Sequence, residues 1–193
     1  MNIAGILLAA GSGNRFGGGK LLHPLPDGVA IGVASARNLL RALPRVVAVV
    51  RPDDAGLGDL LRAEGAEVVV CADAHLGMGA SLACGVRAAA DADGWVIALA
   101  DMPYIAPGTI AAVAQRVERG AAIAAPVYRG ERGHPVAFGA RLRSALLESS
   151  GDEGARALLV RHRREIERVE CDDAGVLRDI DTRADLDGTG VKR

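Results

Sequence analysis

The stretch that decides the fold lies at the start of the chain, where residues 3–20 read IAGILLAAGSGNRFGGGK. Its first part, Ile3–Leu8, is an uncharged apolar run, which predicts a strand buried on both faces of a sheet. A loop with five glycines and two cations, Arg15 and Lys20, follows directly. Glycine lets backbone N–H groups approach a ligand closely, and successive N–H groups form an anion-binding nest. We therefore expect a phosphate site at the end of this strand.

Two better-known phosphate loops do not fit the spacing. A Walker A loop would need glycine where Asn14 stands and a hydroxyl residue where Leu21 stands. The dinucleotide fingerprint would need its third glycine at Phe16, and the acidic residue about 20 positions on is missing, since Asp27 comes too early. A flexible glycine linker is the remaining alternative, but a linker would not start directly from a buried strand.

The stretch resembles the nucleotidyltransferases that attach a nucleotide to the molybdenum cofactor, whose pattern is roughly L-A-A-G-x-S-x-R-M-G-x-x-K. Gly13 stands where that family usually has serine, and Phe16 where it usually has methionine. The resemblance implies that Arg15 and Lys20 hold the triphosphate and act in catalysis. It also implies that the strand end and the loop bind the nucleotide, through Leu8, Ala9, Ala10, Gly11, Ser12, Gly13 and Lys20.

Composition narrows the class of protein. The 193 residues suit one domain of above-average size, and half are hydrophobic while only 3% are aromatic. A core of Ala, Val, Leu and Ile favours α/β layering. The net charge of −1 gives no electrostatic case for binding nucleic acid or an anionic membrane. Three scattered cysteines without C-x-x-C spacing indicate reduced thiols, and we expect a soluble cytoplasmic protein without a spanning helix.

Strand-like and helix-like runs alternate up to residue 125, which predicts a mostly parallel sheet with helices on both faces. The expected strands are Val46–Val50, Glu67–Cys71, Trp95–Leu99 and Ala121–Ala125, and the expected helices are Val29–Leu43, Leu57–Glu64, Gly79–Ala90 and Thr109–Arg119. The pattern then loosens into short extended pieces, two short helices (Leu142–Leu147 and Ala155–Val160) and a half-exposed strand, Ile166–Cys171. We predict a single-domain, three-layer α/β sandwich of Rossmann-like nucleotidyltransferase fold, with residues of about 1–125 binding nucleotide and metal and about 126–187 binding the acceptor.

Two acidic segments are candidate metal ligands. Asp101 follows a strand, so its carboxylate lies where the ligand crevice of a parallel sheet should be, and Mg²⁺ suits such a ligand. The alternative is a turn aspartate that bonds local backbone. Asp179 and Asp181 would share one face of an extended segment, and Asp181 can complete the metal site. Here the alternative is structural, because Thr182 and Asp185 have the spacing of a capping box that opens a last short helix.

The family has the same A-D-M-P and D-I-D-T-P-x-D-L elements, and resemblance implies that Asp101 holds the metal. Arg183 replaces the proline of the second element. The family also has a G-M-G-A-S-L segment near the base and ribose, which implies that Gly79 and Ser81 bind nucleotide, although capping a helix is the commoner role for such a serine. His75, just before this segment, is interpreted as a loop histidine.

Two later segments carry the acceptor prediction. Arg132 and His134 lie in an R-G-H-P turn that the family has near its acceptor substrate, although either side chain can be plain surface. Asp152 and Arg156 belong to a G-D-x-G-A-R segment that also matches the family. The residues themselves favour a structural origin for this second segment, because Ser150-x-x-Glu153 has capping-box spacing. We assign all four residues to substrate binding.

The residues favour a Mg²⁺-dependent nucleotidyl transfer. The chain is most similar to the cytidylyltransferase branch of the family, and the resemblance implies an enzyme that makes molybdopterin cytosine dinucleotide from CTP and molybdenum cofactor, for a recipient enzyme of the xanthine dehydrogenase type. Ala10 favours the cytidylyl branch, since the guanylyl branch more often has a second glycine there. The alternatives are a sibling transferase that uses GTP or a sugar phosphate, and a non-catalytic accessory protein of molybdenum hydroxylase maturation. An NAD-dependent oxidoreductase comes last, for the spacing reasons above.

Overall fold

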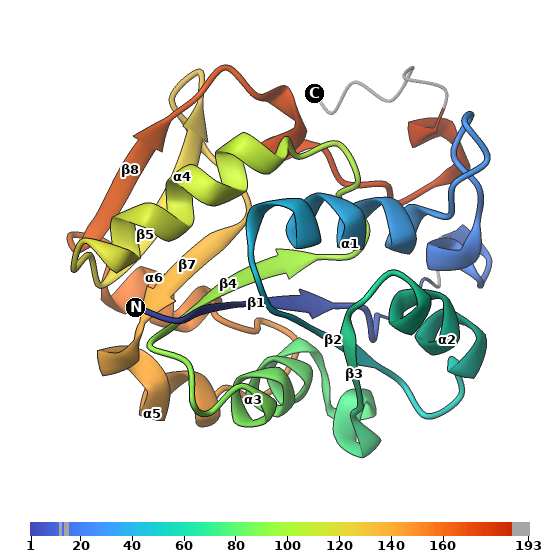
Figure 1. Ribbon diagram of the computed structural model, residues 1–193, viewed down its shortest axis with the longest axis horizontal. Helices are drawn as coiled ribbons and strands as arrows, with labels where there is room; N and C mark the ends of the chain where they lie inside the picture. The colour runs from blue at the N-terminus through green and yellow to red at the C-terminus, as the bar shows by residue number, and fades with distance from the viewer. Residues whose placement is uncertain (12, 14–15, 187–193) are drawn as a thin grey trace.

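The computed structural model describes residues 1–11, 13 and 16–186, and within them eight strands form one sheet (Figure 1). The strand order is β3-β2-β1-β4-β7-β5-β6. Strand β8 pairs with β5 along the edge opposite β7. The strands are β1 (Ile3–Leu8), β2 (Val46–Val50), β3 (Glu67–Val70), β4 (Gly94–Leu99), β5 (Ile123–Tyr128), β6 (Glu131–Arg132), β7 (Val136–Gly139) and β8 (Ile166–Glu170).

Strand β1 lies in the parallel part of the sheet, between β2 and β4. Its residues up to Leu7 are buried, as the uncharged run predicted. Leu8 is in register with Val49 on one side and Leu99 on the other, so the three strands end at the same edge. The loops that follow them, including the glycine-rich loop, therefore meet at that edge.

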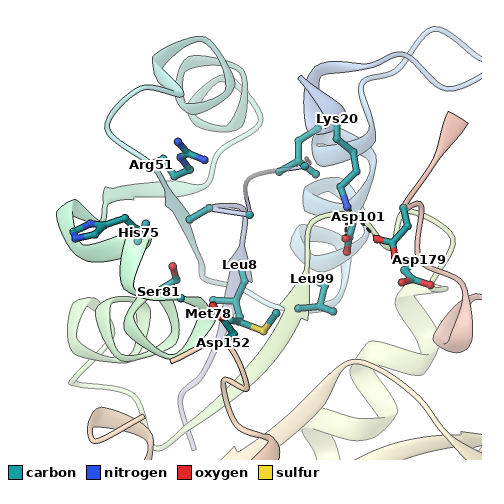
Figure 2. A pocket seen from close by; sticks show the side chains of 17 residues that line it. Leu8, Lys20, Arg51, His75, Met78, Ser81, Leu99, Asp101, Asp152 and Asp179 are labelled. Carbon is teal, nitrogen blue, oxygen red and sulfur yellow. Dashed lines mark hydrogen bonds and ion pairs between the residues drawn. The ribbon is translucent and has the colours of Figure 1, made fainter. Parts of the chain in front are cut away.

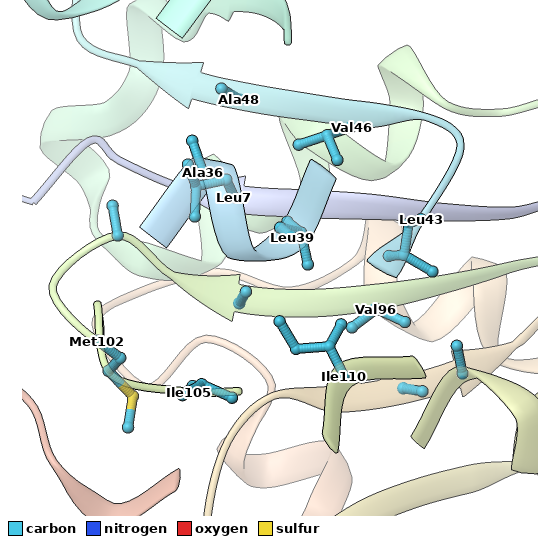
Figure 3. Packing of buried hydrophobic residues seen from close by; sticks show 14 of the residues in the cluster. Leu7, Ala36, Leu39, Leu43, Val46, Ala48, Val96, Met102, Ile105 and Ile110 are labelled. Carbon is cyan, nitrogen blue, oxygen red and sulfur yellow. The ribbon is translucent and has the colours of Figure 1, made fainter. Parts of the chain in front are cut away.

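Helices cover both faces of the sheet, which confirms the three-layer prediction (Figure 1). They are α1 (Ile31–Ala42), α2 (Ala55–Ala63), α3 (Met78–Ala88), α4 (Pro107–Glu118), α5 (Arg143–Leu147) and α6 (Arg156–Arg161). On one face, α1, α2 and α4 pack in a cluster that includes Leu7, Leu39 and Ile110 (Figure 3). On the other face, α3, α5 and α6 pack in a cluster that includes Ile6 and Leu82.

Small residues let these layers approach closely, as the low aromatic content suggested. A Cβ atom on Gly85 of α3 would lie 2.5 Å from Cγ2 of Ile6 on β1, a distance that real Cβ contacts do not reach. Because Gly85 has no side chain, α3 can pack directly against β1.

The second half of the sheet departs from the predicted alternation. The strand expected at Ala121–Ala125 is β5, which begins at Ile123 and does not pair with β4. Strand β7 lies between them and runs antiparallel to both. Only a short turn and β6 separate β5 from β7. Because no crossover helix connects these two strands, β7 runs antiparallel to β5. The sheet is thus mostly parallel but mixed.

No helix in the described part of the chain is long and apolar enough to cross a membrane. The three cysteines are all free thiols, with Cys71 buried and Cys84 and Cys171 partly exposed. Burial raises the pKa of the Cys84 thiol to about 11, with neighbouring Cys71 adding to the effect, so this thiol stays protonated at neutral pH.

Candidate active site

A cavity of about 790 Å³ opens at the carboxyl edge of β1 and β4, where the sequence placed the crevice (Figure 2). It is formed by the ends of these strands, the glycine-rich loop, the start of α3 and two loops from the second half of the chain. Nine of the predicted site residues line it: Leu8, Ala10, Gly11, Gly13, Lys20, Ser81, Asp101, Asp152 and Asp181.

Lys20 joins the glycine-rich loop to the acidic side of the cavity. Its Nζ donates to Oδ2 of Asp101 at 2.7 Å and lies 3.5 Å from Oδ1 of Asp181 (Figure 2). The three side chains are only 12%, 22% and 29% exposed, so these ion pairs are shielded from solvent more than surface pairs are. Asp101 thus engages a residue 81 positions away, which a purely local turn aspartate would not do.

The second acidic segment lines the cavity and also forms the capping box that its sequence allowed. Asp179 and Asp181 line the cavity on either side of Ile180, which is fully buried. The backbone N–H of Ile180 donates to the carbonyl oxygen of Asp101 at 2.9 Å, so the two acidic segments are tied together. The capping box of Thr182 and Asp185 is also present and opens a 3-10 turn at Arg183–Asp185.

The donor set suits a divalent cation bound with a substrate. The described residues contain no group of three or more His, Cys, Asp or Glu side chains that could hold a metal by themselves. Mg²⁺ typically takes one or two carboxylates and completes its shell with substrate phosphates and water. Asp101 and Asp181 already share one cation, the ammonium group of Lys20, so the space between them accepts positive charge.

The start of α3 supplies the opposite wall. Gly77, Met78 and Ser81 line the cavity, whereas Gly79 does not. A Cβ on Gly79 would lie 2.5 Å from the backbone of Ser150, and its N–H donates to the carbonyl of Gly151 at 2.8 Å. Gly79 therefore lets the loop that carries Asp152 pack against the helix.

Ser81 does not cap this helix. The helix begins three residues earlier, at Met78, and its N-cap is Gly77, which makes no side-chain capping bond. Ser81 is buried in the first turn, and it lines the cavity. The alternative role of Ser81, capping the helix, is therefore wrong, because Ser81 lies inside the first turn.

The predicted acceptor residues divide into two groups. Asp152 lines the cavity, but Arg132 and Arg156 are exposed and lie outside its lining. The capping box expected at Ser150 and Glu153 is absent, because α6 begins only at Arg156 and no side chain caps it.

His134 lies behind the carboxylates and outside the cavity lining. Its Nδ1 atom is buried and has no hydrogen-bond partner among the described residues. Burial lowers the pKa of this imidazole, and Arg132 lowers it further, while Asp101 and Asp179 oppose the shift. The imidazole is therefore neutral at pH 7.

The remaining predicted residues are Ala9, Ser12 and Arg15. Ala9 is fully buried in the core below it. Ser12 and Arg15 lie outside the described residues.

The sequence analysis missed part of the wall. Asp179 was recognised only as the neighbour of Asp181, and His75 was interpreted as a loop residue, yet both line the cavity. Arg51 lines it too, on the side opposite Asp101 (Figure 2), and Asp53 holds its guanidinium at 3.0 and 2.8 Å. Arg51 directly follows β2, so the parallel topology was a signal that could have found it.

Relatives of known sequence or structure match nearly the whole chain. It is 34% identical over 196 residues to the purine catabolism protein PucB of Bacillus subtilis, covering 96% of this chain and 94% of PucB. It is 31% identical over 191 residues to the nicotine blue oxidoreductase of Paenarthrobacter nicotinovorans, covering 93% and 92%. The crystal structure of Rv0371c from Mycobacterium tuberculosis superposes with a TM-score of 0.83 at 28% identity, covering 98% and 97%.

A second structure of Rv0371c, in complex with manganese, matches with a TM-score of 0.79 at 26% identity, covering 98% of each chain. Residues 5–166 match the MobA-like NTP transferase domain family, a range that runs from β1 to the start of β8 and includes Lys20, Asp101 and Asp152 but not Asp179 and Asp181. The chain therefore belongs to the MobA-like NTP transferase family.

Proposed function

We propose that the chain transfers a cytidylyl group from CTP to the terminal phosphate of molybdenum cofactor, releasing pyrophosphate and forming molybdopterin cytosine dinucleotide. The observation that carries the proposal is the cluster of Lys20, Asp101 and Asp181 at the end of β1, beside the glycine-rich loop. Nucleotidyl transfer requires mainly that the protein position the reactants and stabilise charge. A cation, carboxylates and backbone N–H donors can do both.

Each part of this cluster has a role in the proposed reaction. Lys20, with Arg15, holds the triphosphate and stabilises the charge that develops on the departing pyrophosphate. Asp101 and Asp181 hold Mg²⁺, which screens phosphate charge from an anionic nucleophile when it is bound. When nucleotide and metal bind, Lys20 would turn from the carboxylates to the triphosphate, because its ammonium group and a divalent cation at Asp101 repel each other. The manganese bound by Rv0371c supports a divalent cation here.

The nucleophile in this reaction is itself a phosphate, which is already ionised near neutral pH and needs no dedicated base. His134 lies outside the cavity lining and its lowered pKa makes it a weak base, which this reaction permits because no proton has to be removed. In the proposed arrangement, Asp152 contacts the acceptor at the cavity wall, and Arg132, His134 and Arg156 act from the surrounding part of about residues 126–187.

The choice of CTP rests on Ala10, and the choice of acceptor on the family and on PucB, whose name places it in purine catabolism. Purine oxidation is the work of xanthine-dehydrogenase-type enzymes, the proposed recipients. The test is mass spectrometry of the product formed from molybdenum cofactor and an equimolar mixture of CTP and GTP. A cytosine dinucleotide alone supports the proposal, whereas a guanine dinucleotide keeps the reaction and overturns the base.

A second candidate function comes from the relative named nicotine blue oxidoreductase. A reductase of this fold would bind a reduced nicotinamide nucleotide in the same cavity, yet hydride transfer has no use for two carboxylates that share a cation. The discriminating measurement follows NADH and NADPH absorbance with a quinone-type dye as acceptor. Substrate-dependent oxidation without any pyrophosphate release from a nucleotide panel would favour the reductase. A chain that binds CTP and cofactor but does neither reaction would be an accessory protein.

A further inference from the structure

The glycine-rich loop and the second acidic segment share a small core of their own, separate from the two large clusters on the sheet. Its buried side chains are Phe16, Leu25, Ile31 and Ile180, which we call the loop core. Phe16 is only 5% exposed and Ile180 is fully buried. These residues come from both ends of the chain, 164 positions apart for this pair, so the loop core joins segments that the sheet does not hold together.

Both of these side chains are tied through the backbone to residues that line the cavity. The N–H of Phe16 donates to the carbonyl of Gly13 at 3.0 Å, and Gly13 forms part of the wall beside Lys20. Ile180 stands between Asp179 and Asp181, and its N–H holds the carbonyl of Asp101. Movement of either apolar side chain therefore moves groups that face the proposed triphosphate or the proposed metal.

Arg183 covers the outer side of Phe16. Its Cζ atom lies 5.7 Å from the centroid of the Phe16 ring, within the range of a cation–π contact. His23 approaches the same ring in an edge arrangement, with centroids 5.2 Å apart. Phe16 and Arg183 are two of the positions at which this chain departs from the pattern in its glycine-rich loop and its second acidic element, and the two replacements contact each other.

The ion pairs of Lys20 with Asp101 and Asp181 also link the glycine-rich loop to the carboxylates. These ion pairs must break when Lys20 binds the triphosphate. In the proposed function Lys20 leaves Asp101 and Asp181 for the triphosphate. The loop core contains no group that binds a ligand, so it persists through this exchange. It is the contact that keeps the loop at a fixed distance from the carboxylates while Lys20 changes partner.

We propose that Phe16 and Ile180 are positioning residues, which hold the triphosphate loop and the metal-binding carboxylates as one unit, and that Arg183 stabilises this contact from outside. The proposal rests on the proposed function for the identity of the ligands. The coupling itself is a property of the free protein and is measured there first.

The experiment compares Ile180→Ala with Ile123→Ala, a fully buried isoleucine of β5 in a different cluster. Hydrogen–deuterium exchange of the free protein reports on the amides of Leu22, His23 and Leu25, which are hydrogen-bonded within the loop region. We expect Ile180→Ala to speed their exchange about tenfold although its site is remote in sequence, and Ile123→Ala to leave it unchanged. Ile180→Val and Ile123→Val repeat the comparison with a smaller cavity, in case either alanine variant does not fold.

Ligand binding is then measured with Mn²⁺ alone and with inorganic tripolyphosphate. We expect Ile180→Ala and Phe16→Leu to weaken both by about tenfold, as loss of supporting contacts around a metal site does. Arg183→Gln should give a smaller loss that Arg183→Lys restores. If Ile180→Ala lowers the melting temperature as Ile123→Ala does but changes neither exchange nor binding, the coupling is refuted. If the exchange responds but the wild type binds neither probe, the coupling stands, while the positioning role fails together with the proposed function.

Discussion

The two halves of the sheet build the site by different rules. In the first half, β1, β2 and β4 run parallel, and residues directly after them, Arg51 and Asp101 among them, line one cavity at one edge. In the second half, β7 runs antiparallel to β4, and the turn before it, not the loop after it, lies near that edge. That turn carries His134, and the charges of Asp101 and Asp179 act on its imidazole.

This difference suggests a division of labour. In the proposed function, the first half presents groups at the strand ends, such as Asp101, to the nucleotide and the metal. The second half contributes Asp152, Asp179 and Asp181 from loops, and leaves Arg132 and Arg156 outside the cavity lining. We expect substitutions of Lys20 and Asp101 in the first half, and of the proposed metal ligand Asp181, to stop the reaction. Substitutions of Asp152, Arg132 and Arg156 in the second half should change how well the acceptor is used.

The largest effect is expected at Asp101. Asp101→Asn should lower turnover by about a thousandfold or more, because a neutral amide neither holds a divalent cation well nor pairs with Lys20. Turnover and Mn²⁺ affinity are measured together, with circular dichroism to verify folding. Asp59→Asn, on an exposed carboxylate of α2, is the matched control and should behave as the wild type. An Asp101→Asn protein that is merely unfolded would make this residue structural.

Lys20→Ala should lower turnover by about a hundredfold and weaken triphosphate binding. Mn²⁺ alone should bind this variant at least as tightly as the wild type, because the ammonium group that occupies the space between the carboxylates is gone. Isothermal titration with tripolyphosphate and with Mn²⁺ separates the two effects. Arg62→Ala, which removes an exposed cation of α2, is the control. Unchanged triphosphate affinity in Lys20→Ala would remove this residue from the site.

In the second half, Arg156→Ala and Arg132→Ala should each raise the KM for the acceptor by about three- to tenfold, since each removes one charged contact made only when the cofactor is bound. The KM for the nucleotide should stay unchanged. Steady-state kinetics with each substrate varied in turn tests this split. Equal changes in both KM values would contradict the division between the halves.

The smallest effect concerns stability. Since the pKa of His134 is lower in the folded protein than its ordinary value of 6.5, the unfolded chain binds more protons below that pH. The contribution of His134 to stability is therefore complete above about pH 6.5 and is lost as the pH falls through that value toward the folded pKa. Urea unfolding between about pH 5 and pH 8 should show a steeper loss of unfolding free energy on acidification for the wild type than for His134→Asn. Identical slopes would mean that His134 titrates normally.

The sequence predicted the first half well for a physical reason. Buried parallel strands such as Ile3–Leu8 and Val46–Val50 are continuous apolar runs, and their carboxyl ends are bound to meet, so Lys20 and Asp101 could be placed together. The strand order of the second half could not be predicted from the sequence. It depends on which strand edges pair, and short strands such as β6 and β7 have no sequence periodicity that indicates their direction. Ser150 and Glu153 have capping spacing without forming a cap, and only the packing of Gly79 on Ser150 explains how Asp152 reaches the cavity.

The most direct test of the account measures pyrophosphate release by the wild type and by Asp101→Asn, with Mg²⁺, molybdenum cofactor and CTP. The account predicts release by the wild type that requires all three components, and none above background by the variant. Release that does not need the cofactor, or that survives in folded Asp101→Asn, would contradict the claim that this cavity carries out nucleotidyl transfer through its paired carboxylates.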